Sequence, residues 1–150
     1  MNLFIIRHTV ASTEGMDFER EITSDGKLKL LTKINFWKES FIEFDVILLS
    51  PLLRAKQTSE IIAEHFGKVG LIQVENSLKP GCKPSDLEVL LQIYNVKSIA
   101  VVGHEPDCSS FVSYFCKSFP PDLYFETAGL AHISFKIKAE RGKGELINIK

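Results

Sequence analysis

The chain opens with Asn2-Leu-Phe-Ile-Ile-Arg7-His8-Thr9, a short apolar run that ends in a guanidinium and an imidazole. Two further apolar runs, 46–49 and 99–102, repeat this pattern. Continuous apolar runs of this length are typical of strands buried on both faces, as in a parallel sheet. The first run therefore predicts the N-terminal strand of such a sheet, with polar side chains at its carboxyl end.

Segments with helical periodicity lie between these apolar runs. Apolar residues recur on one face over about 25–42, 51–66, 86–94 and 106–115. Thr23 or Ser24 is the expected cap of the first helix, and Ser50, followed by Pro51, is the expected cap of the second. We predict four helices that connect the strands.

The end of the chain has a different pattern. Residues 130–137 and 146–149 alternate between apolar and polar, with Arg141-Gly-Lys-Gly144 as a turn between them. A further strand is expected at 71–74. The alternation of strands and helices predicts one α/β domain over residues 1–150, with a mainly parallel sheet and a terminal antiparallel hairpin. The segment from His8 to about Ile22 matches neither pattern and is long enough to be a functional loop.

Composition excludes several classes of protein. The chain has 150 residues, with 18 Lys and Arg against 19 Asp and Glu, and a formal net charge of −1. A near-neutral chain argues against a basic nucleic-acid binder or a polybasic membrane anchor. Three cysteines at irregular spacing indicate reduced thiols, and the first apolar run is too short for a signal peptide or a membrane span. We expect a cytoplasmic protein.

Unusual polar residues follow three of the predicted strands. Arg7 and His8 follow the first, Arg54 lies in the first turn of the helix after the second, and His104 and Glu105 follow the run at 99–102. Ligands of open parallel sheets bind outside the carboxyl ends of the strands, so these side chains should meet there. Potential cations that converge without a matching carboxylate cluster favour a bound anion. Guanidinium forks and a helix N-terminus suit phosphoryl oxygens, which predicts phosphate chemistry.

Three ordered motifs carry a family resemblance. Arg7-His8-Thr9, Ser50-Pro-Leu-Leu-Arg54-Ala-Lys-Gln-Thr58 and Val102-Gly-His104-Glu-Pro are similar to the signatures of the histidine phosphatase superfamily, which includes the phosphoglycerate mutases. The short chain most resembles SixA-type phosphohistidine phosphatases. Arg20-Glu-Ile-Thr23-x-x-Gly26 and Phe125-x-Thr-Ala-Gly129-Leu-Ala extend the likeness over almost the whole chain. The resemblance implies a three-layer α/β/α sandwich of the phosphoglycerate mutase type.

The resemblance also implies roles for four residues. His8 would be the nucleophile and form a phosphoenzyme that water hydrolyses, with no metal or other cofactor. Arg7 and Arg54 would bind phosphoryl oxygens, and His104 would add a donor, charged if it is protonated. The surrounding cations should lower the pKa of His8 and keep it nucleophilic, while its second ring nitrogen is held, we expect, by a backbone carbonyl.

The first loop and the candidate proton donors depart from the family pattern. Thr9 stands where Gly is commonest, and its hydroxyl could contact phosphate or the backbone. Glu14 stands where mutase-like members have Asn, so its carboxylate must point away or serve as the acid. Glu105, Glu14 and Asp17 are the candidate proton donors, and helix capping is the alternative role of Glu105.

The leading hypothesis is a metal-independent phosphatase that acts on phosphohistidine in a protein, such as a phosphotransfer domain. An alternative keeps the same chemistry with a small phosphomonoester as substrate. A second alternative is a domain that binds phosphorylated ligands without turnover. A mutase is disfavoured, because the chain has little length for an enclosing lid. Neither a nucleic acid nor a membrane is an expected partner.

Overall fold

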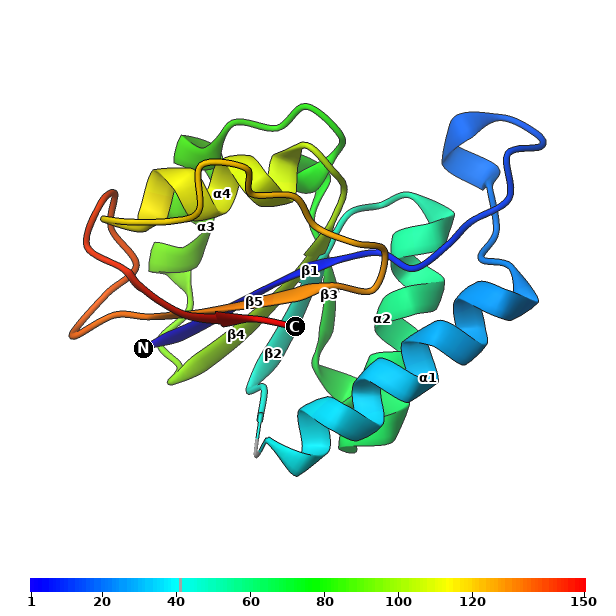
Figure 1. The fold of residues 1–150 in the computed structure, drawn as a ribbon, viewed down its shortest axis with the longest axis horizontal. Helices are drawn as coiled ribbons and strands as arrows, with labels where there is room; N and C mark the ends of the chain where they lie inside the picture. Colours follow the sequence, from blue (N-terminus) through cyan, green and yellow to red (C-terminus); the bar gives the residue numbers. More distant parts are fainter. Residues whose placement is uncertain (41) are drawn as a thin grey trace.

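The computed structural model describes residues 1–40 and 42–150, and within them six strands form one sheet in the order β3-β2-β4-β1-β5-β6 (Figure 1). The strands are β1 (Asn2–Arg7), β2 (Val46–Leu49), β3 (Ile72–Val74), β4 (Ser98–Gly103), β5 (Leu130–Ser134) and β6 (Glu145–Ile149). The first four are parallel to one another, whereas β5 pairs antiparallel with both β1 and β6. The predicted parallel sheet with an antiparallel edge hairpin is confirmed.

Helices cover both faces of this sheet. Helices α1 (Ser24–Glu39) and α2 (Leu53–Phe66) pack on one face, and α3 (Pro84–Ile93) and α4 (Asp107–Phe115) pack on the other (Figure 1). Short 3-10 turns form η1 (Asp17–Glu19), η2 (Val69–Leu71) and η3 (Asn76–Leu78). The architecture is therefore the three-layer α/β/α sandwich that the family resemblance implies. None of the helices described is long and apolar enough to cross a membrane.

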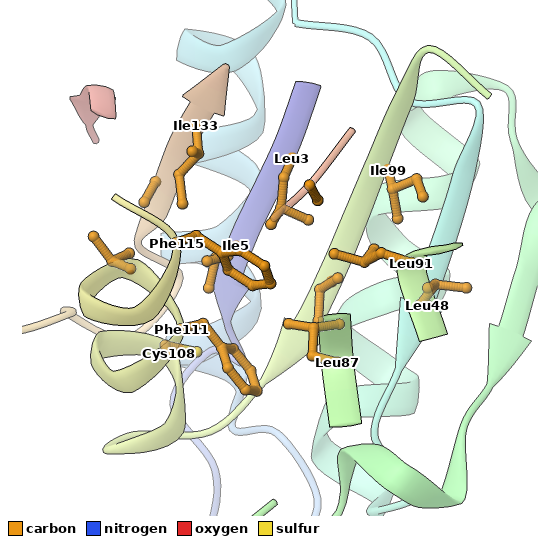
Figure 2. Close-up of a cluster of buried hydrophobic side chains, with 14 of the residues drawn as sticks. Leu3, Ile5, Leu48, Leu87, Leu91, Ile99, Cys108, Phe111, Phe115 and Ile133 are labelled. Carbon is orange, nitrogen blue, oxygen red and sulfur yellow. The ribbon is translucent and has the colours of Figure 1, made fainter. Parts of the chain in front are cut away.

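Strand β1 supplies side chains to the cores on both faces. Leu3 and Ile5 point toward α3 and α4, where they join the cluster around Phe111 (Figure 2). Phe4 and Ile6 belong to the opposite cluster under α1 and α2. Because successive side chains of a strand alternate between faces, a continuous apolar run is needed when both faces are covered. The central β1 and its neighbour β4 thereby hold the site residues at their carboxyl ends.

The starts of the first two helices differ in how they are capped. Thr23 caps α1, since its hydroxyl accepts from the N–H of Gly26 at 3.0 Å. Helix α2 begins at Leu53, with no side-chain cap. The prediction that Ser50 caps this helix is wrong, because Leu52 is the residue before the helix. The Ser50 hydroxyl accepts from the Leu52 N–H at 3.4 Å and contacts His104. The sequence predicts a first helix that reaches about 42, but α1 ends at Glu39 with Ser40 as its C-terminal cap; Phe41 lies outside the described residues.

The loop from His8 to Ile22 is fixed at both ends. Ala11 and Ile22 form an isolated antiparallel bridge, and η1 lies within the loop. Gly26, in the first turn of α1, packs against the backbone of Val10, where an added Cβ would lie 2.3 Å from the carbonyl oxygen. Only glycine allows this approach, which holds the loop beside the carboxyl end of β1.

Candidate active site

A cavity of about 400 Å³ opens at the carboxyl ends of β1 and β4. Strand register explains why its two imidazoles meet: Arg7 pairs with Gly103, so the next residues, His8 and His104, extend side by side. Their ring centroids are 5.1 Å apart. The cavity is lined by Arg7, His8, Val10, Ala11, Asp17, Arg20, Arg54, Pro80, His104, Glu105 and Thr127. The structure thus brings together all four residues that the sequence analysis placed in one pocket.

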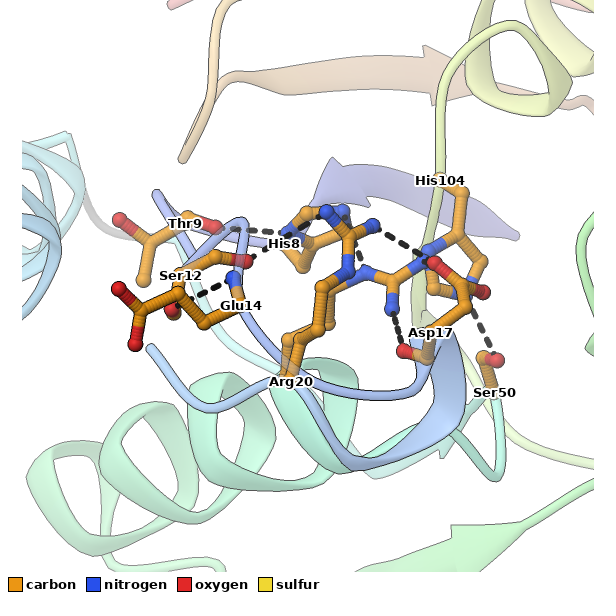
Figure 3. Close-up of polar contacts among 9 residues, drawn as sticks. His8, Thr9, Ser12, Glu14, Asp17, Arg20, Ser50 and His104 are labelled. Atoms are coloured by element: carbon orange, nitrogen blue, oxygen red, sulfur yellow. Dashed lines mark hydrogen bonds and ion pairs between the residues drawn. The ribbon is translucent and has the colours of Figure 1, made fainter. Parts of the chain in front are cut away.

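The imidazole of His8 is held through both ring nitrogens (Figure 3). Nδ1 lies 2.6 Å from the carbonyl oxygen of Thr9, and Nε2 lies 3.2 Å from Nε of Arg54. Since the guanidinium can only donate, Nε2 carries the lone pair and Nδ1 carries the proton. Burial, together with the charges of Arg54 and Arg7, lowers the pKa of His8 to about 4. At neutral pH its Nε2 is therefore unprotonated.

His104 is buried and neutral. Its Nε2 lies 2.7 Å from the hydroxyl oxygen of Ser50, and its Nδ1 has no hydrogen-bond partner among the described residues. Burial first, and then the neighbouring His8 and Arg54, lower the pKa of His104 to about 3. When the Ser50 hydroxyl donates to Nε2, the proton lies on Nδ1, which is then free to donate to a ligand.

Arg54 is almost fully buried and is held by Asp17 of η1. Its Nη1 donates to the Asp17 carbonyl oxygen at 2.6 Å, and its Nη2 lies 3.4 Å from the Asp17 carboxylate. Arg20 pairs with the same carboxylate at 2.7 Å. The sequence predicts converging cations without a matching carboxylate, but Asp17 supplies one beside Arg54 and Arg20. Although desolvation acts in the opposite direction, Arg54 and Arg20 hold the pKa of Asp17 below its ordinary value.

Arg7 is held from the opposite side by the segment before β5. Its Nη1 donates to the hydroxyl of Tyr124 at 2.9 Å and to the carbonyl oxygen of Phe125 at 2.6 Å. The guanidinium carbon also lies 5.4 Å from the centroid of the Tyr124 ring. Its buried Nε makes no hydrogen bond to any described residue. Two fixed contacts on Nη1 leave the remaining donors available for an anion.

The other candidate acids are engaged elsewhere or lie outside the cavity. Glu105 accepts hydrogen bonds from the backbone N–H of Ser109 at 3.2 Å, from the Ser109 hydroxyl and from the N–H of Phe125 at 3.3 Å. It caps α4 and ties that helix to the segment that holds Arg7. Glu14 is exposed and does not line the cavity.

Thr9 has a structural role. Its side chain is buried and its hydroxyl donates to the carbonyl oxygen of Gly26 at 2.7 Å, while its N–H donates to the Thr58 hydroxyl at 3.2 Å. Of the two roles left open for this hydroxyl, the structure shows the backbone contact. Thr9 therefore joins the His8 segment to α1 and α2.

Three residues of this site are not predicted from the sequence. The sequence indicates Arg20 only as part of a family motif and Ser50 only as a helix cap, and it does not point to Tyr124. The motifs that contain Arg20 and Ser50 were a usable signal. Tyr124 had none, because no periodic pattern predicts the course of its loop. Across residues 1–40 and 42–150, no group of three His, Cys, Asp or Glu side chains could hold a metal ion.

Known proteins are similar to this chain over almost its whole length. Over 148 residues the chain is 28% identical to the phosphohistidine phosphatase SixA of Escherichia coli, a match that covers 96% of this chain and 89% of the relative. The solved structure of the protein histidine phosphatase SixA complexed with tungstate superposes with a TM-score of 0.86 at 25% identity, covering 99% and 96% of the two chains. The chain belongs to the histidine phosphatase superfamily.

Two other matches are similar to this chain in sequence or in fold. An uncharacterised protein of Picosynechococcus is 30% identical over 114 residues, which cover 71% of this chain and 68% of that protein. The mycobacterial glucosyl-3-phosphoglycerate phosphatase shares the fold, with a TM-score of 0.72 at 13% identity over 97% and 96% of the chains. No model of a protein family matches the sequence. The resemblance drawn from the three motifs is confirmed.

Proposed function

We propose that this histidine phosphatase superfamily member hydrolyses phosphohistidine through a phosphoenzyme formed on Nε2 of His8. The observation that carries the proposal is the state of this imidazole. Its Nδ1 proton is fixed on the Thr9 carbonyl, and its pKa of about 4 leaves Nε2 unprotonated at neutral pH. The name of the SixA relative describes the same substrate chemistry.

The reaction takes two displacements at phosphorus. In the first, the Nε2 lone pair forms a bond to phosphorus while the P–N bond of the substrate breaks, and the leaving imidazole takes up a proton. In the second, water attacks phosphorus, the bond to Nε2 breaks, and the water loses a proton as inorganic phosphate forms. Splitting the reaction in this way is the usual advantage of a covalent intermediate.

The surrounding donors supply electrostatic stabilisation. Arg54 donates its Nε–H to Nε2 of His8 when the site is free, so this donor must turn to a phosphoryl oxygen when the nucleophile attacks. Arg7, with its unpartnered Nε, and His104, with its unpartnered Nδ1, bind the remaining oxygens. Donors held in place before the reaction stabilise developing charge with little reorganisation, and only the Arg54 Nε–H has to change its acceptor.

The carboxylates of the site favour a phosphoramidate over a phosphomonoester. Asp17 is ionised by its arginine partners, and Glu105 accepts three hydrogen bonds at the start of α4. Neither is poised to protonate an alkoxide. A leaving imidazole is protonated by solvent or before attack and needs less help, so phosphohistidine suits this site better than a sugar phosphate.

A trapping experiment tests the proposal. Rapid acid-free quench of the wild-type protein with a phosphohistidine substrate should yield protein phosphorylated on His8. His8→Ala should lose this label and roughly 1,000-fold or more of the turnover. His65→Ala, which removes an imidazole from α2 outside the cavity, is the matched control and should keep both. Turnover retained in His8→Ala would overturn the nucleophile assignment.

A further inference from the structure

Three large apolar side chains are exposed next to residues that line the cavity. Met16, Phe18 and Tyr124 have exposed fractions of 61%, 55% and 66%. We call these three residues the apolar rim. Scattered exposed apolar residues are common on proteins, so exposure alone decides nothing. The position of these three relative to the cationic cavity is the informative feature.

The rim residues lie on two sides of the cavity. Met16 and Phe18 flank Asp17, whose carbonyl and carboxylate hold Arg54. The η1 segment that carries them projects away from the sheet (Figure 1). Tyr124 comes from the segment before β5 and contacts Arg7 through its hydroxyl and its ring. The two arginines that face the phosphoryl position are thus each attached to an exposed apolar element.

Charge changes sign between the cavity and its rim. Inside the cavity lie Arg7, Arg20 and Arg54. Outside, Glu14 and Glu19 are exposed beside the rim, and neither forms an ion pair with another described residue. Acidic groups at an entrance repel small, highly charged anions. They also repel a phosphoryl group on a protein, but a neutral or basic surface around that group offsets the repulsion.

Building on the proposed function, we propose that the apolar rim docks a folded protein whose phosphohistidine lies on an apolar, non-acidic surface. The phosphoryl group enters the cavity, while Met16, Phe18 and Tyr124 pack against the side chains around it. Interface cores are depleted in charge and enriched in aromatic residues and Met, which matches this rim. A partner of this kind also covers Tyr124, and thus excludes water from its contact with Arg7.

Two substrates separate docking from phosphoryl chemistry. The double variant Met16→Ser/Phe18→Ser removes the rim on one side, and η1 has no buried residue that would endanger the fold. With a phosphotransfer domain phosphorylated on histidine, we expect KM to rise about tenfold and kcat to change little. With free phosphoramidate, kcat/KM should stay within about twofold of wild type. Ile137→Ser, at the far end beside Met1, removes a side chain that is 82% exposed and should affect neither substrate.

The outcomes distinguish the two proposals. Equal losses on both substrates, no loss on either, or the same loss in Ile137→Ser would overturn the docking surface. A sedimentation coefficient that falls in the double variant alone would assign the rim to self-association and also overturn it. Turnover of phosphoramidate but of no phosphoprotein by the wild-type protein would also overturn the docking surface. It would not contradict the proposed phosphoryl chemistry. Absence of a phosphoenzyme with either substrate would overturn the proposed function itself.

Discussion

At the scale of single residues, the roles of the candidate acids depend on their hydrogen bonds. Glu105 directly follows His104 and lines the cavity, so position alone would make it a proton donor. Its carboxylate instead accepts from Ser109 and Phe125. Accepting several donors suits a structural carboxylate at a helix start. The side chain therefore holds Arg7 indirectly, through the backbone of Phe125.

This assignment predicts the behaviour of Glu105→Ala. The variant leaves two backbone N–H groups without their acceptor, so we expect the free energy of unfolding to fall by roughly 1–3 kcal/mol. Because Arg7 is loosened, kcat/KM should fall by a similar factor for phosphoramidate, aryl phosphate and alkyl phosphate. Steady-state kinetics across these substrates and urea denaturation measure both effects. A loss that grows steeply as the leaving group becomes more basic would identify Glu105 as the acid after all.

At the scale of elements, the junction between the loop 8–22 and α1 sets the position of η1. Thr9 donates to the Gly26 carbonyl, the N–H of Thr23 donates to the Val10 carbonyl, and Ala11 pairs with Ile22. These contacts close the loop at its base and place Asp17 over Arg54. The loop is thus part of the arginine-binding framework and not a loose connection.

The same junction predicts a strong effect of Gly26→Ala. The new Cβ would lie 2.3 Å from the Val10 carbonyl oxygen, so α1 or the loop must move. We expect a loss of about 1–3 kcal/mol in the free energy of unfolding, by overpacking, and a clear fall in kcat/KM as Asp17 shifts. Gly70→Ala is the matched control, because nothing lies within 4 Å of its added Cβ. Equal stability of the two variants in urea denaturation would contradict this account.

At the scale of the whole molecule, the net charge of −1 conceals a strongly uneven distribution. Three guanidinium groups line one cavity, balanced in part by Asp17 and by acidic residues outside it. Their field and the burial of the site hold His8 and His104 neutral, with pKa values of about 4 and about 3. A near-neutral protein can thus be strongly cationic at one edge of its sheet.

This burial makes the stability of the fold depend on pH. Both histidines have pKa values below the 6.5 of an exposed imidazole, so between about pH 6.5 and about 4 the unfolded chain binds protons that the folded chain does not. Stability should therefore fall by a few kcal/mol as the pH drops through this window. Denaturant unfolding at a series of pH values measures the slope.

A variant isolates the contribution of the site. In His8→Gln/His104→Gln most of this slope should vanish. A smaller part of the slope should remain, because burial also lowers the pKa of His132. An unchanged slope in the double variant would show that the two site histidines do not carry the effect.

The sequence alone was sufficient to predict the order of strands and helices, the parallel sheet and the meeting of Arg7, His8, Arg54 and His104. Apolar periodicity is local, and the carboxyl ends of parallel strands must lie at one edge, so these conclusions needed no side-chain coordinates. The predicted start of α2 was wrong, because the Ser50 hydroxyl bonds to His104 after the neighbouring strand and to no N–H within the helix.

Only the tertiary structure decided which neighbours each site residue contacts and what role it has there. Asp17 and Arg54 are 37 positions apart, and Arg7 and Tyr124 are 117 apart, so no local pattern links them. Their contacts depend on how the packed sheet and helices place two irregular loops. The same packing excludes water from the imidazoles and so leaves His8 unprotonated. Residue types determined which groups are present, and burial with fixed hydrogen bonds determined their protonation and their partners.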